Sequence, residues 1–448
     1  LTRSSAASDV YKRQKSYSKK NSPNFTFFEG PPSANGKPGI HHVMARTIKD
    51  AFCRYKTLKG FNVKRKAGWD THGLPVELGV EKELGISKDD IGNSISISEY
   101  NEACKAAVMK YTSDWESLTE IMGYWIDLSD PYVTYNSKYM ETVWWIISKI
   151  HEKKLLYKGY TVQPYSPKAG SGLSTHELNQ PGAYKNINDT SVTAQFNCVI
   201  DSLPDMFKKY YPFSFLAWTT TPWTLPSNTA LTVGPKIEYS FIKTFNQYTK
   251  KKITIVMATE LIEKVLTGKF FCVKNEDDLN LFKNKDSKIP YIILESYKGV
   301  DFENIRYEKI WQESPNPIDN PENAYRVITG DFVTTDDGTG IVHTAPTFGA
   351  DDYKVAKTAK PEVPPLQVLD NKGNKVPLVD LNGKFIDGIG SISGKYVKNE
   401  YYDDNSAPEK SVDVEIAIKL KEQNLAFKVE KYLHSYPHCW RTDKPILY

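Results

Sequence analysis

Two short segments near the start of the chain constrain its fold more than any other feature. The first is a Gly/Pro-rich loop at residues 30–39, which joins an apolar stretch at residues 25–28 to a helical pattern beginning near Val43. A strand that turns through such a loop into a helix aims free backbone N–H groups and the positive end of the helix dipole at one spot, which suits a phosphate. The second segment, residues 68–77, places the carboxylate of Asp70 among Gly, Pro and apolar neighbours, where it could pair with a substrate ammonium. Together they predict an α/β domain with a nucleotide half and an amino-acid half of one site.

Hydrophobic spacing predicts where the helices lie. After the loop, apolar residues recur mostly at steps of three and four, which predicts an amphipathic helix over residues 43–59 with Gly60 as its C-terminal stop. Similar patterns predict further helices over residues 98–122, 137–154 and 413–423.

A long middle region has a different pattern. From residue 190 to about residue 397, short β-type runs alternate with loops rich in Asn, Asp, Lys and Gly, which predicts a separate β-rich domain. The clearest of these runs are residues 215–218, 253–256 and 341–342.

Length and composition fit a soluble protein of several domains. A chain of 448 residues suggests roughly three domains. No apolar run approaches the roughly 18 residues of a membrane span, the densest being residues 143–147. The five cysteines are widely spaced and odd in number, which argues against a disulfide framework and for a reducing cytosol.

The first residues are strongly basic. Residues 1–20 hold six basic side chains and one acidic one, so the other 428 residues carry a net charge of −1 out of a total of +4. A nucleic-acid partner would therefore be held by local basic patches. Residues 1–14 have no apolar periodicity, and we hypothesise that they are a non-native scar from a transposon end used in preparing sequencing libraries. Resequencing the source gene and finding these codons contiguous with it would refute that hypothesis.

Both early segments resemble the isoleucyl-tRNA synthetases, a family of class I aminoacyl-tRNA synthetases. The resemblance extends from about Asn21 to the end of the chain. The string Gly-Trp-Asp-x-His-Gly-Leu-Pro-x-Glu at residues 68–77 is specific within that group, since valyl enzymes carry Gly-Thr-Asp-His-Ala-Gly and leucyl enzymes carry Phe in place of His72. The resemblance therefore favours isoleucine over the sister amino acids.

The resemblance implies a split architecture of the α/β class. The first half of a Rossmann-like nucleotide-binding domain would be interrupted by an inserted β-rich α/β editing domain, followed by a return segment. The second half of the Rossmann sheet, a Lys-Met-Ser-Lys-Ser-type loop and an anticodon-binding region would be absent, as in an incomplete gene product. The expected parts are a tail at residues 1–20, the first half at 21–165, a connecting hinge at 166–189, the editing domain at 190–411 and the return segment at 412–448.

The helix start is the expected ATP site. Forming an aminoacyl-adenylate means attack of a carboxylate on the α-phosphate of ATP, which depends on positioning and charge stabilisation more than on proton transfer. The family has His-x-Gly-His at this junction, and the matching positions are Gly39, Ile40, His41 and His42, so only the final His matches. The resemblance implies ATP binding by Gly39, His41 and His42, with His41 and His42 as catalytic residues. The alternative is a capped helix start with solvated histidines.

The expected isoleucine pocket contains Pro31 and Asp70. The resemblance makes Pro31 an apolar wall and Asp70 the partner of the α-ammonium, a charge-assisted bond worth about 1.5–3 kcal/mol. Without the surrounding string, Asp70 would more simply cap a turn before Gly73. His72 is expected to be a structural hydrogen bonder.

Two later strings resemble the editing site of the family. One methylene is worth only about 1–3 kcal/mol in an apolar pocket, so discrimination of isoleucine from valine calls for a second, hydrolytic site. Residues 218–228 offer hydroxyls to bind the terminal adenosine and orient a water, although a Thr cluster alone is usually strand surface. Residues 338–352 supply an imidazole and a carboxylate. The resemblance makes Asp352 the catalytic anchor of the valyl ammonium, with Asp351 pointing elsewhere, and His343 a wall against isoleucine. The expected editing residues are Thr219, Thr220, Thr221, Trp223, Asn228, His343 and Asp352.

No protein-bound metal is expected. Family members often hold zinc with two Cys-x-x-Cys pairs at the base of the insertion. The corresponding positions are Ser166, Ala169, Cys439 and Thr442, so one thiolate of four remains. We predict no zinc, with ATP as a substrate that brings Mg²⁺ on its phosphates.

The full-length protein is thus expected to be a cytoplasmic, monomeric ligase without membrane association. Its partners would be tRNA(Ile), L-isoleucine and ATP, and it would edit Val-tRNA(Ile). A free-standing deacylase using only the inserted domain and a non-catalytic tRNA-binding module are the alternatives. The gene sequence beyond Tyr448 would separate them, because a Lys-Met-Ser-Lys-Ser-like loop supports the ligase and a stop codon favours the deacylase.

Overall fold

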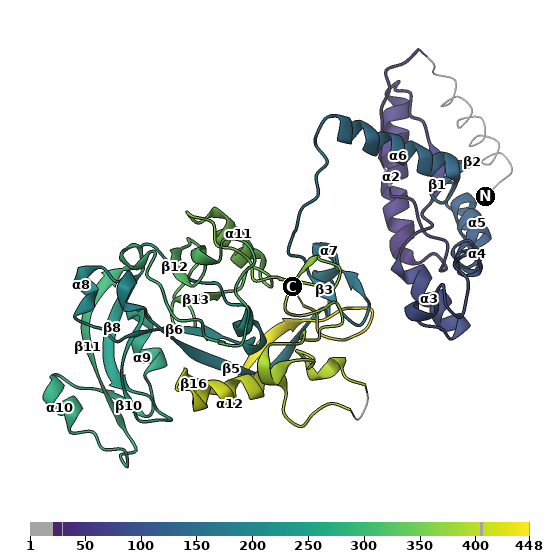
Figure 1. Ribbon diagram of the computed structural model, residues 1–448. Coiled ribbons are helices and arrows are strands. Elements are labelled where there is room, and N and C mark those ends of the chain that lie inside the picture. The colour runs from purple at the N-terminus through teal and green to yellow at the C-terminus, as the bar shows by residue number, and fades with distance from the viewer. Residues whose placement is uncertain (1–20, 29, 404–405, 448) are drawn as a thin grey trace. The chain divides into compact units, whose positions relative to one another are not determined.

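The computed structural model describes residues 21–28, 30–403 and 406–447, so the expected tail and the hypothesised scar lie outside the described residues. The chain divides into two compact units, Leu1–Gly159 and Tyr160–Tyr448, which Figure 1 traces by colour. The finer domain boundaries expected from the sequence remain a proposal.

The first unit is built on a short parallel sheet. Strands β1 (Lys66–Trp69) and β2 (Asp127–Val133) run parallel, and the chain passes through helices between them, because parallel neighbours need a long crossover connection. Trp69 packs with Ala34 and Trp115 into a small core that fixes the loop against the sheet. The helices of this unit are α2 (Ile40–Leu58), α3 (Leu74–Leu84), α4 (Ile97–Val108), α5 (Thr112–Ile121) and α6 (Ser137–Glu152).

Helix α2 confirms the helix expected over residues 43–59, although it begins earlier, at Ile40. It ends at Leu58, and Gly60 follows with a φ of +97°, a left-handed conformation that glycine adopts without strain. The apolar stripe that predicted the helix, which includes Met44, is exposed, whereas Asp50 on the opposite side is buried. The burial of Asp50 is satisfied, because its carboxylate accepts hydrogen bonds from the Arg54 guanidinium and the Trp125 amide.

Two expectations for this unit are wrong in detail. Residues 25–28 do not form a strand, since pairing there is limited to a bridge between Asn24 and Asn62, and a strand requires a partner along its length. The helix expected over residues 98–122 is two helices, α4 and α5, with a break around Met109 to Tyr111. The break lets the amide of Tyr111 donate to the carbonyl of Ala34, 3.0 Å away, so it ties the helices to the loop.

The second unit is built on two larger sheets. A seven-stranded sheet has the order β10-β11-β8-β9-β6-β5-β16, and a three-stranded sheet has the order β12-β7-β13. Both are mixed, since β6–β9, β10–β11 and β12–β7 are parallel pairs and the other neighbours are antiparallel. The strands are β5 (Tyr184–Asn197), β6 (Ser214–Thr219), β7 (Ala230–Val233), β8 (Glu238–Phe245), β9 (Lys252–Ala258), β10 (Phe270–Cys272), β11 (Ile289–Lys298), β12 (Arg326–Thr329), β13 (Ile341–Thr344) and β16 (Ala426–Pro437).

Burial along β5 follows its neighbours in the sheet. Its first half alternates between exposed and partly buried positions, whereas residues 190–196 are all buried. The change comes where β6 joins the ladder, since β6 pairs with residues 192–197 of β5. The β-rich region expected from residue 190 to about 397 is therefore confirmed as strand-rich, and β16 extends it further along the chain.

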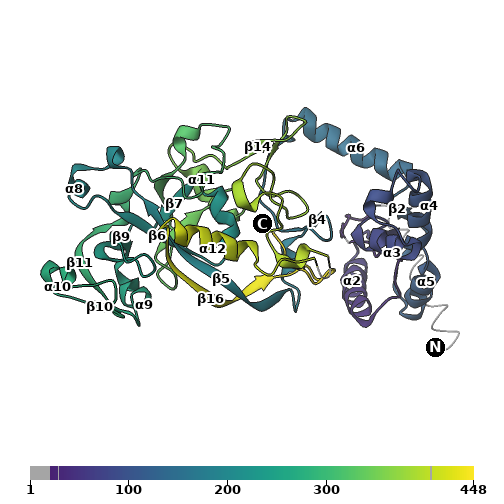
Figure 2. The ribbon, with the colours of Figure 1, turned by 60° about the horizontal axis from the view of Figure 1, so that its bottom comes forward.

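Helices cover these sheets and complete a mixed α/β structure, which confirms the expected fold class. Figures 1 and 2 both show α12 (Val412–Glu422) lying along β5 and β16, and it confirms the helix expected over residues 413–423. Val355 of α11 packs on Ala230 of β7 and Ile328 of β12. The other helices and strands are α7 (Thr175–Leu178), α8 (Asp205–Lys208), α9 (Ile262–Val265), α10 (Glu276–Asn280), α11 (Ala350–Thr358), β3 (Tyr165–Ser166), β4 (Ser171–Gly172), β14 (Val368–Leu369) and β15 (Lys375–Val376).

Candidate functional site

The start of α2 is organised around His42. Its Nδ1 accepts a hydrogen bond of 2.9 Å from the amide of Gly39, so in the neutral ring the proton sits on Nε2. The ring lies edge-on against Trp115, with the centroids 4.8 Å apart. Burial is the main cause that lowers the pKa of His42, and the neighbouring His41, Arg46 and Lys49 lower it further. His42 is thus a neutral N–H donor at the helix N-terminus, which suits a phosphate oxygen.

His41 and Gly39 lie beside it. His41 is exposed, and its ring centroid is 3.8 Å from that of His42. A Cβ atom at Gly39 would come within 2.9 Å of the His41 ring, so glycine leaves the room that this ring occupies. The three residues expected to bind ATP are therefore adjacent.

Asp70 follows β1 directly and is tied to the loop. Its amide donates to the carbonyl of Pro32 at 3.0 Å, which joins the two segments that the sequence singled out. Its carboxylate accepts a hydrogen bond of 3.3 Å from the amide of His72, so the turn-capping contact is present. Nδ1 of His72 lies 3.0 Å from the hydroxyl of Thr134, a contact that fits a structural hydrogen bonder.

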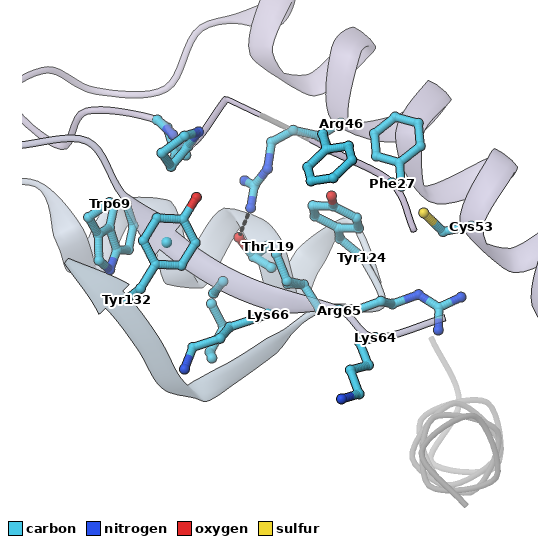
Figure 3. A pocket seen from close by; sticks show the side chains of 17 residues that line it. Phe27, Arg46, Cys53, Lys64, Arg65, Lys66, Trp69, Thr119, Tyr124 and Tyr132 are labelled. Atoms are coloured by element: carbon cyan, nitrogen blue, oxygen red, sulfur yellow. Dashed lines mark hydrogen bonds between the residues drawn. The ribbon is translucent and has the colours of Figure 1, made fainter. Parts of the chain in front are cut away.

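A cavity of about 270 Å³ lies along β1, and Pro31 is among its lining residues. Figure 3 shows the guanidinium of Arg46 reaching to the hydroxyl of Thr119, 2.6 Å away, at the edge of this cavity. Arg46 also lies over the rings of Trp115 and Tyr124, at 5.6 and 5.0 Å from their centroids. Neither Asp70 nor His42 is among the residues that line the cavity. Pro31 and Arg46 thus line the same cavity, whereas Asp70 and His42 lie outside its lining.

The second unit gathers most of the expected editing residues around one pocket. Its volume is about 240 Å³, and it lies between the 3₁₀ helix η3 (Pro222–Ser227), strand β13 and helix α11. These elements meet because β13 pairs with β7, which follows η3 in the chain. The residues that line the pocket are Trp218, Thr219, Thr220, Thr221, Thr224, Val342, His343, Ala345, Phe348 and Asp352.

Asp352 supplies the carboxylate of this pocket. It lies in the first turn of α11, and its Oδ2 accepts a hydrogen bond of 2.8 Å from the amide of Ala345. Burial raises the pKa of Asp352 to about 6, and the adjacent Asp351 also raises it. A Cβ atom at Gly349 would come within 2.8 Å of the Asp352 carboxyl carbon, so a side chain there would displace it. Asp351 is exposed and outside the lining, as expected.

His343 is held at both ring nitrogens. Nδ1 lies 2.8 Å from Nδ2 of Asn228, and Nε2 lies 3.0 Å from the hydroxyl of Thr224. The ring is 7 % exposed, and burial lowers its pKa to about 3. His343 is therefore neutral at any physiological pH.

The threonines and the two remaining expected residues are arranged around it. The hydroxyl of Thr219 lies 3.2 Å from that of Thr221 and accepts from the Thr221 amide at 3.0 Å. Asn228 stands behind His343, and Trp223 lies behind the pocket with its ring edge-on to Phe348, 5.0 Å between centroids. Trp223 and Asn228 support the pocket wall without lining it.

Sequence reasoning missed residues that brace this pocket. Oδ1 of Asp413, at the start of α12, accepts a hydrogen bond of 2.9 Å from the amide of Trp223, and Lys398 lies beside it. Tyr307 donates to Oδ1 of Asn228 at 2.7 Å. Thr224 lies inside the Thr-rich string, so the sequence could have suggested it as a pocket residue. Lys398 and Tyr307 lie outside the sequence motifs.

The positions corresponding to the zinc ligands do come together. Cys439 is fully buried, which by itself raises its thiol pKa, but the neighbouring Thr442 and Ser166 outweigh this effect and lower the pKa. Ser166 Oγ also accepts from the amide of Ala169 at 3.3 Å. Across residues 21–28, 30–403 and 406–447, three or more His, Cys, Asp or Glu side chains are nowhere grouped so that they could hold a metal ion. The absence of zinc stays a prediction.

The chain is similar to known proteins along most of its length. The family described as tRNA synthetases class I (I, L, M and V) matches residues 4–327. The isoleucine–tRNA ligase of Cytophaga hutchinsonii is 56 % identical over 438 residues, and that of Bacteroides fragilis is 55 % identical over 443 residues. Each alignment covers 95 % of this chain and 38 % of the relative, so the chain spans well under half the length of these curated relatives.

A crystal structure named GlLeuRS-CP1 is 14 % identical, with a TM-score of 0.34, and covers 54 % of this chain and 99 % of its own. Among the described helices, none combines the length and the apolar character that crossing a bilayer requires. The match of the class I model over residues 4–327 is the finding that assigns the family. The chain belongs to the class I tRNA synthetases of the group that comprises the I, L, M and V enzymes.

Proposed function

We propose that the protein ligates L-isoleucine to tRNA(Ile) through an isoleucyl-adenylate and removes valine from mischarged tRNA(Ile) by hydrolysis. ATP enters as a substrate with Mg²⁺ on its phosphates, and no residue is assigned to the metal. The proposal includes a cytoplasmic location and a monomeric state. The observation that carries it is the pocket of the second unit, where Asp352 and His343 face the hydroxyls of the Thr-rich string.

Asp352 is suited to anchor the α-ammonium of a valyl ester. Its carboxylate is desolvated, which raises its pKa to about 6, so a bound cation would favour the ionised form more than it does for a carboxylate in water. Because Ala345 already fixes one oxygen, the carboxylate has a defined direction in the pocket. Anchoring the ammonium there would hold the ester carbonyl beside the hydroxyls of Thr219 and Thr221.

His343 has a steric role in this proposal and does not transfer a proton. Hydrolysis requires water to attack the ester carbonyl, with loss of the ribose oxygen as leaving group and release of valine. Both ring nitrogens of His343 are engaged in hydrogen bonds, and its lowered pKa makes it a poor base. We therefore assign orientation of the water to the Thr hydroxyls, and exclusion of the larger isoleucine side chain to His343.

The synthetic half rests on the start of α2 and the end of β1. The Nε2–H of His42 and the helix N-terminus offer donors to the phosphates of ATP. Asp70, partly exposed after β1, is the proposed partner of the isoleucine ammonium, and Pro31 the apolar wall. The chain covers 38 % of the length of a curated relative, so we propose these two roles for a protein of the relative's full length.

The editing half is tested by deacylation. The 448-residue chain is incubated with Val-tRNA(Ile) and, separately, with Ile-tRNA(Ile), and release of the amino acid is followed. Faster hydrolysis of Val-tRNA(Ile) is the expected result. Hydrolysis of neither substrate, or of both at the same rate, would contradict the editing assignment.

A free-standing deacylase is the second candidate. It is favoured by one observation: the second unit gathers most of the expected editing residues around a pocket, whereas Asp70 and His42 lie outside the lining of the cavity along β1. Isoleucine-dependent pyrophosphate exchange by the product of the complete gene separates the candidates. The ligase requires such exchange, and Asp70→Ala should lower kcat/KM for isoleucine there by roughly 10-fold or more, given about 1.5–3 kcal/mol for a charge-assisted bond.

A further inference from the structure

A chain of hydrogen bonds runs behind the editing pocket. The hydroxyl of Tyr307 donates to Oδ1 of Asn228 at 2.7 Å. Nδ2 of Asn228 lies 2.8 Å from the carbonyl oxygen of Ala230 and 2.8 Å from Nδ1 of His343. The other ring nitrogen of His343 lies 3.0 Å from the hydroxyl of Thr224.

Two backbone carbonyl groups, which can only accept, fix the donor and the acceptor in each of these hydrogen bonds. The carbonyl of Ala230 only accepts, so the group of Asn228 that faces it is the NH₂, which then also donates to Nδ1 of His343. At the other end the hydroxyl of Thr224 donates to the carbonyl of Thr221 at 2.9 Å, so its oxygen accepts from Nε2 of His343. His343 therefore carries its proton on Nε2, and the lone pair on Nδ1 is occupied.

Among the described residues, Tyr307 is the one side chain that donates a hydrogen bond to the remaining oxygen of this amide. Tyr307 and Asn228 are each 2 % exposed, so without the phenol the Asn228 Oδ1 would be a buried acceptor with nothing donating to it. The orientation of the amide would then depend on its contacts with backbone carbonyls such as that of Ala230, and the ring of His343 would be held less firmly. Tyr307 is itself held in the core, since its amide donates to Tyr325 and its ring lies edge-on to Phe196.

We propose that Tyr307 is a positioning residue of the editing pocket: through Asn228 it fixes the ring orientation and the Nε2–H tautomer of His343, and thereby the width of the pocket wall. The consequence for selectivity rests on the proposed editing function, whereas the tautomer does not. A fixed wall excludes a side chain one methylene larger, and a ring free to rotate or to change tautomer does so less well.

The chain offers a matched control. Tyr325 lies next to Tyr307, with the ring centroids 6.4 Å apart, and its buried hydroxyl has no hydrogen-bond partner within the described part of the chain. Tyr307→Phe and Tyr325→Phe each remove one buried phenol oxygen from the same region, but only the first touches Asn228. A general effect on packing would appear in both variants.

The tautomer is read directly by NMR. The 448-residue chain is labelled with ¹⁵N-histidine, and the His343 signals are assigned by their loss in His343→Gln. The parent chain should show an unprotonated Nδ1 and a protonated Nε2. Tyr307→Phe should shift these signals toward a mixture of tautomers, and Tyr325→Phe should leave them unchanged. Asn228→Asp, which presents only acceptors, should move the proton to Nδ1 and serves as a second variant if Tyr307→Phe does not fold.

Selectivity is the second readout. The ratio of Val-tRNA(Ile) to Ile-tRNA(Ile) hydrolysis should fall severalfold in Tyr307→Phe and stay at the parental value in Tyr325→Phe. A parent with the proton on Nδ1, or a Tyr307→Phe variant with parental signals and a parental ratio, would overturn the proposal. If the parent shows the expected tautomer but hydrolyses neither substrate, the editing function fails while the assignment of Tyr307 to the tautomer stands.

Discussion

The ammonium of Lys398 lies 3.8 Å from Oδ2 of Asp413, and both side chains are buried in the second unit. A second carboxylate, Asp189, lies 2.7 Å from the same ammonium. Burial opposes the charge on Lys398, but Asp413 and Asp189 outweigh it and raise the pKa of the lysine. Since Asp413 also binds the amide of Trp223, this ion cluster fixes the turn that carries the wall of the pocket.

Lys398→Met should therefore destabilise the second unit strongly. The substitution leaves the buried Asp413 and the partly exposed Asp189 without this cation. Removing one partner of a buried pair typically costs about 3–5 kcal/mol. Denaturant unfolding followed by circular dichroism measures the loss. Lys395→Met is the control, because its pair with Glu415 is more exposed and worth about 0–1 kcal/mol. Equal shifts for the two variants would show that the cluster does not stabilise the fold.

The stability of the fold should depend on pH through Asp352. Its pKa is raised from 3.8 to about 6, so the folded chain retains this proton at a pH where the unfolded chain has lost it. Stability should fall as pH rises from about 4 to 6, by about 3 kcal/mol at most, and Asp352→Asn should remove that contribution.

Anchoring an ammonium requires the ionised carboxylate, so kcat/KM for Val-tRNA(Ile) hydrolysis should rise with pH up to about 6 and then level off. The measurement is the pH profile of deacylation between about pH 4.5 and 8. A profile that is flat through pH 6 would mean that Asp352 does not act as a carboxylate in the free enzyme.

His343→Ala should widen the pocket. Loss of the imidazole opens space next to Val342 and Phe348, so hydrolysis of Ile-tRNA(Ile) should increase relative to that of Val-tRNA(Ile). The ratio of the two deacylation rates is the measurement. His438→Ala, at a buried histidine outside the pocket, should keep the parental ratio. An unchanged ratio in His343→Ala would exclude the ring as the selective wall.

Metal analysis should find much less than one zinc per chain after purification without chelator. Cys439 is the single thiol at its site, and its neighbours Ser166 and Thr442 offer only hydroxyls, which are not among the usual ligands of zinc. Cys439→Ser should have the same low zinc content. One tightly held zinc in the parent that is lost in this variant would show that Cys439 is a zinc ligand and would contradict the prediction.

The sequence predicted those helices that local hydrophobic spacing determines. Steps of three and four placed α2, α6 and α12. The two editing strings come together because β13, in the second string, pairs with β7, which directly follows the first string. The strand expected at residues 25–28 was wrong, since strand formation depends on a partner that local pattern does not reveal. The break between α4 and α5 depends on the contact of Tyr111 with Ala34, far away in sequence.

The residues that support the pocket could not be predicted from the sequence, because their contacts also depend on residues far away in the chain. Lys398 and Asp189 are 209 residues apart in the chain, and Tyr307 reaches Asn228 across 79 residues. Neither Lys398 nor Tyr307 stands in a motif, and burial of a lysine or a tyrosine cannot be read from its neighbours in sequence. In contrast, His343 and Asp352 lie in the strings that suggested them. Their roles in editing stay predictions.

The central claim is that Asp352 anchors the substrate of a hydrolytic pocket, and its neighbour Asp351 provides the sharpest comparison. Both are acidic residues in the first turn of α11, but only Asp352 lines the pocket. Removing a buried charge partner costs on the order of 2–5 kcal/mol, which is about thirtyfold or more in rate. The measurement is kcat/KM for Val-tRNA(Ile) hydrolysis by the parent, Asp352→Ala and Asp351→Ala. We predict a loss of at least about thirtyfold for Asp352→Ala and a much smaller loss for Asp351→Ala. Parental activity in Asp352→Ala, with or without a loss in Asp351→Ala, would contradict the account.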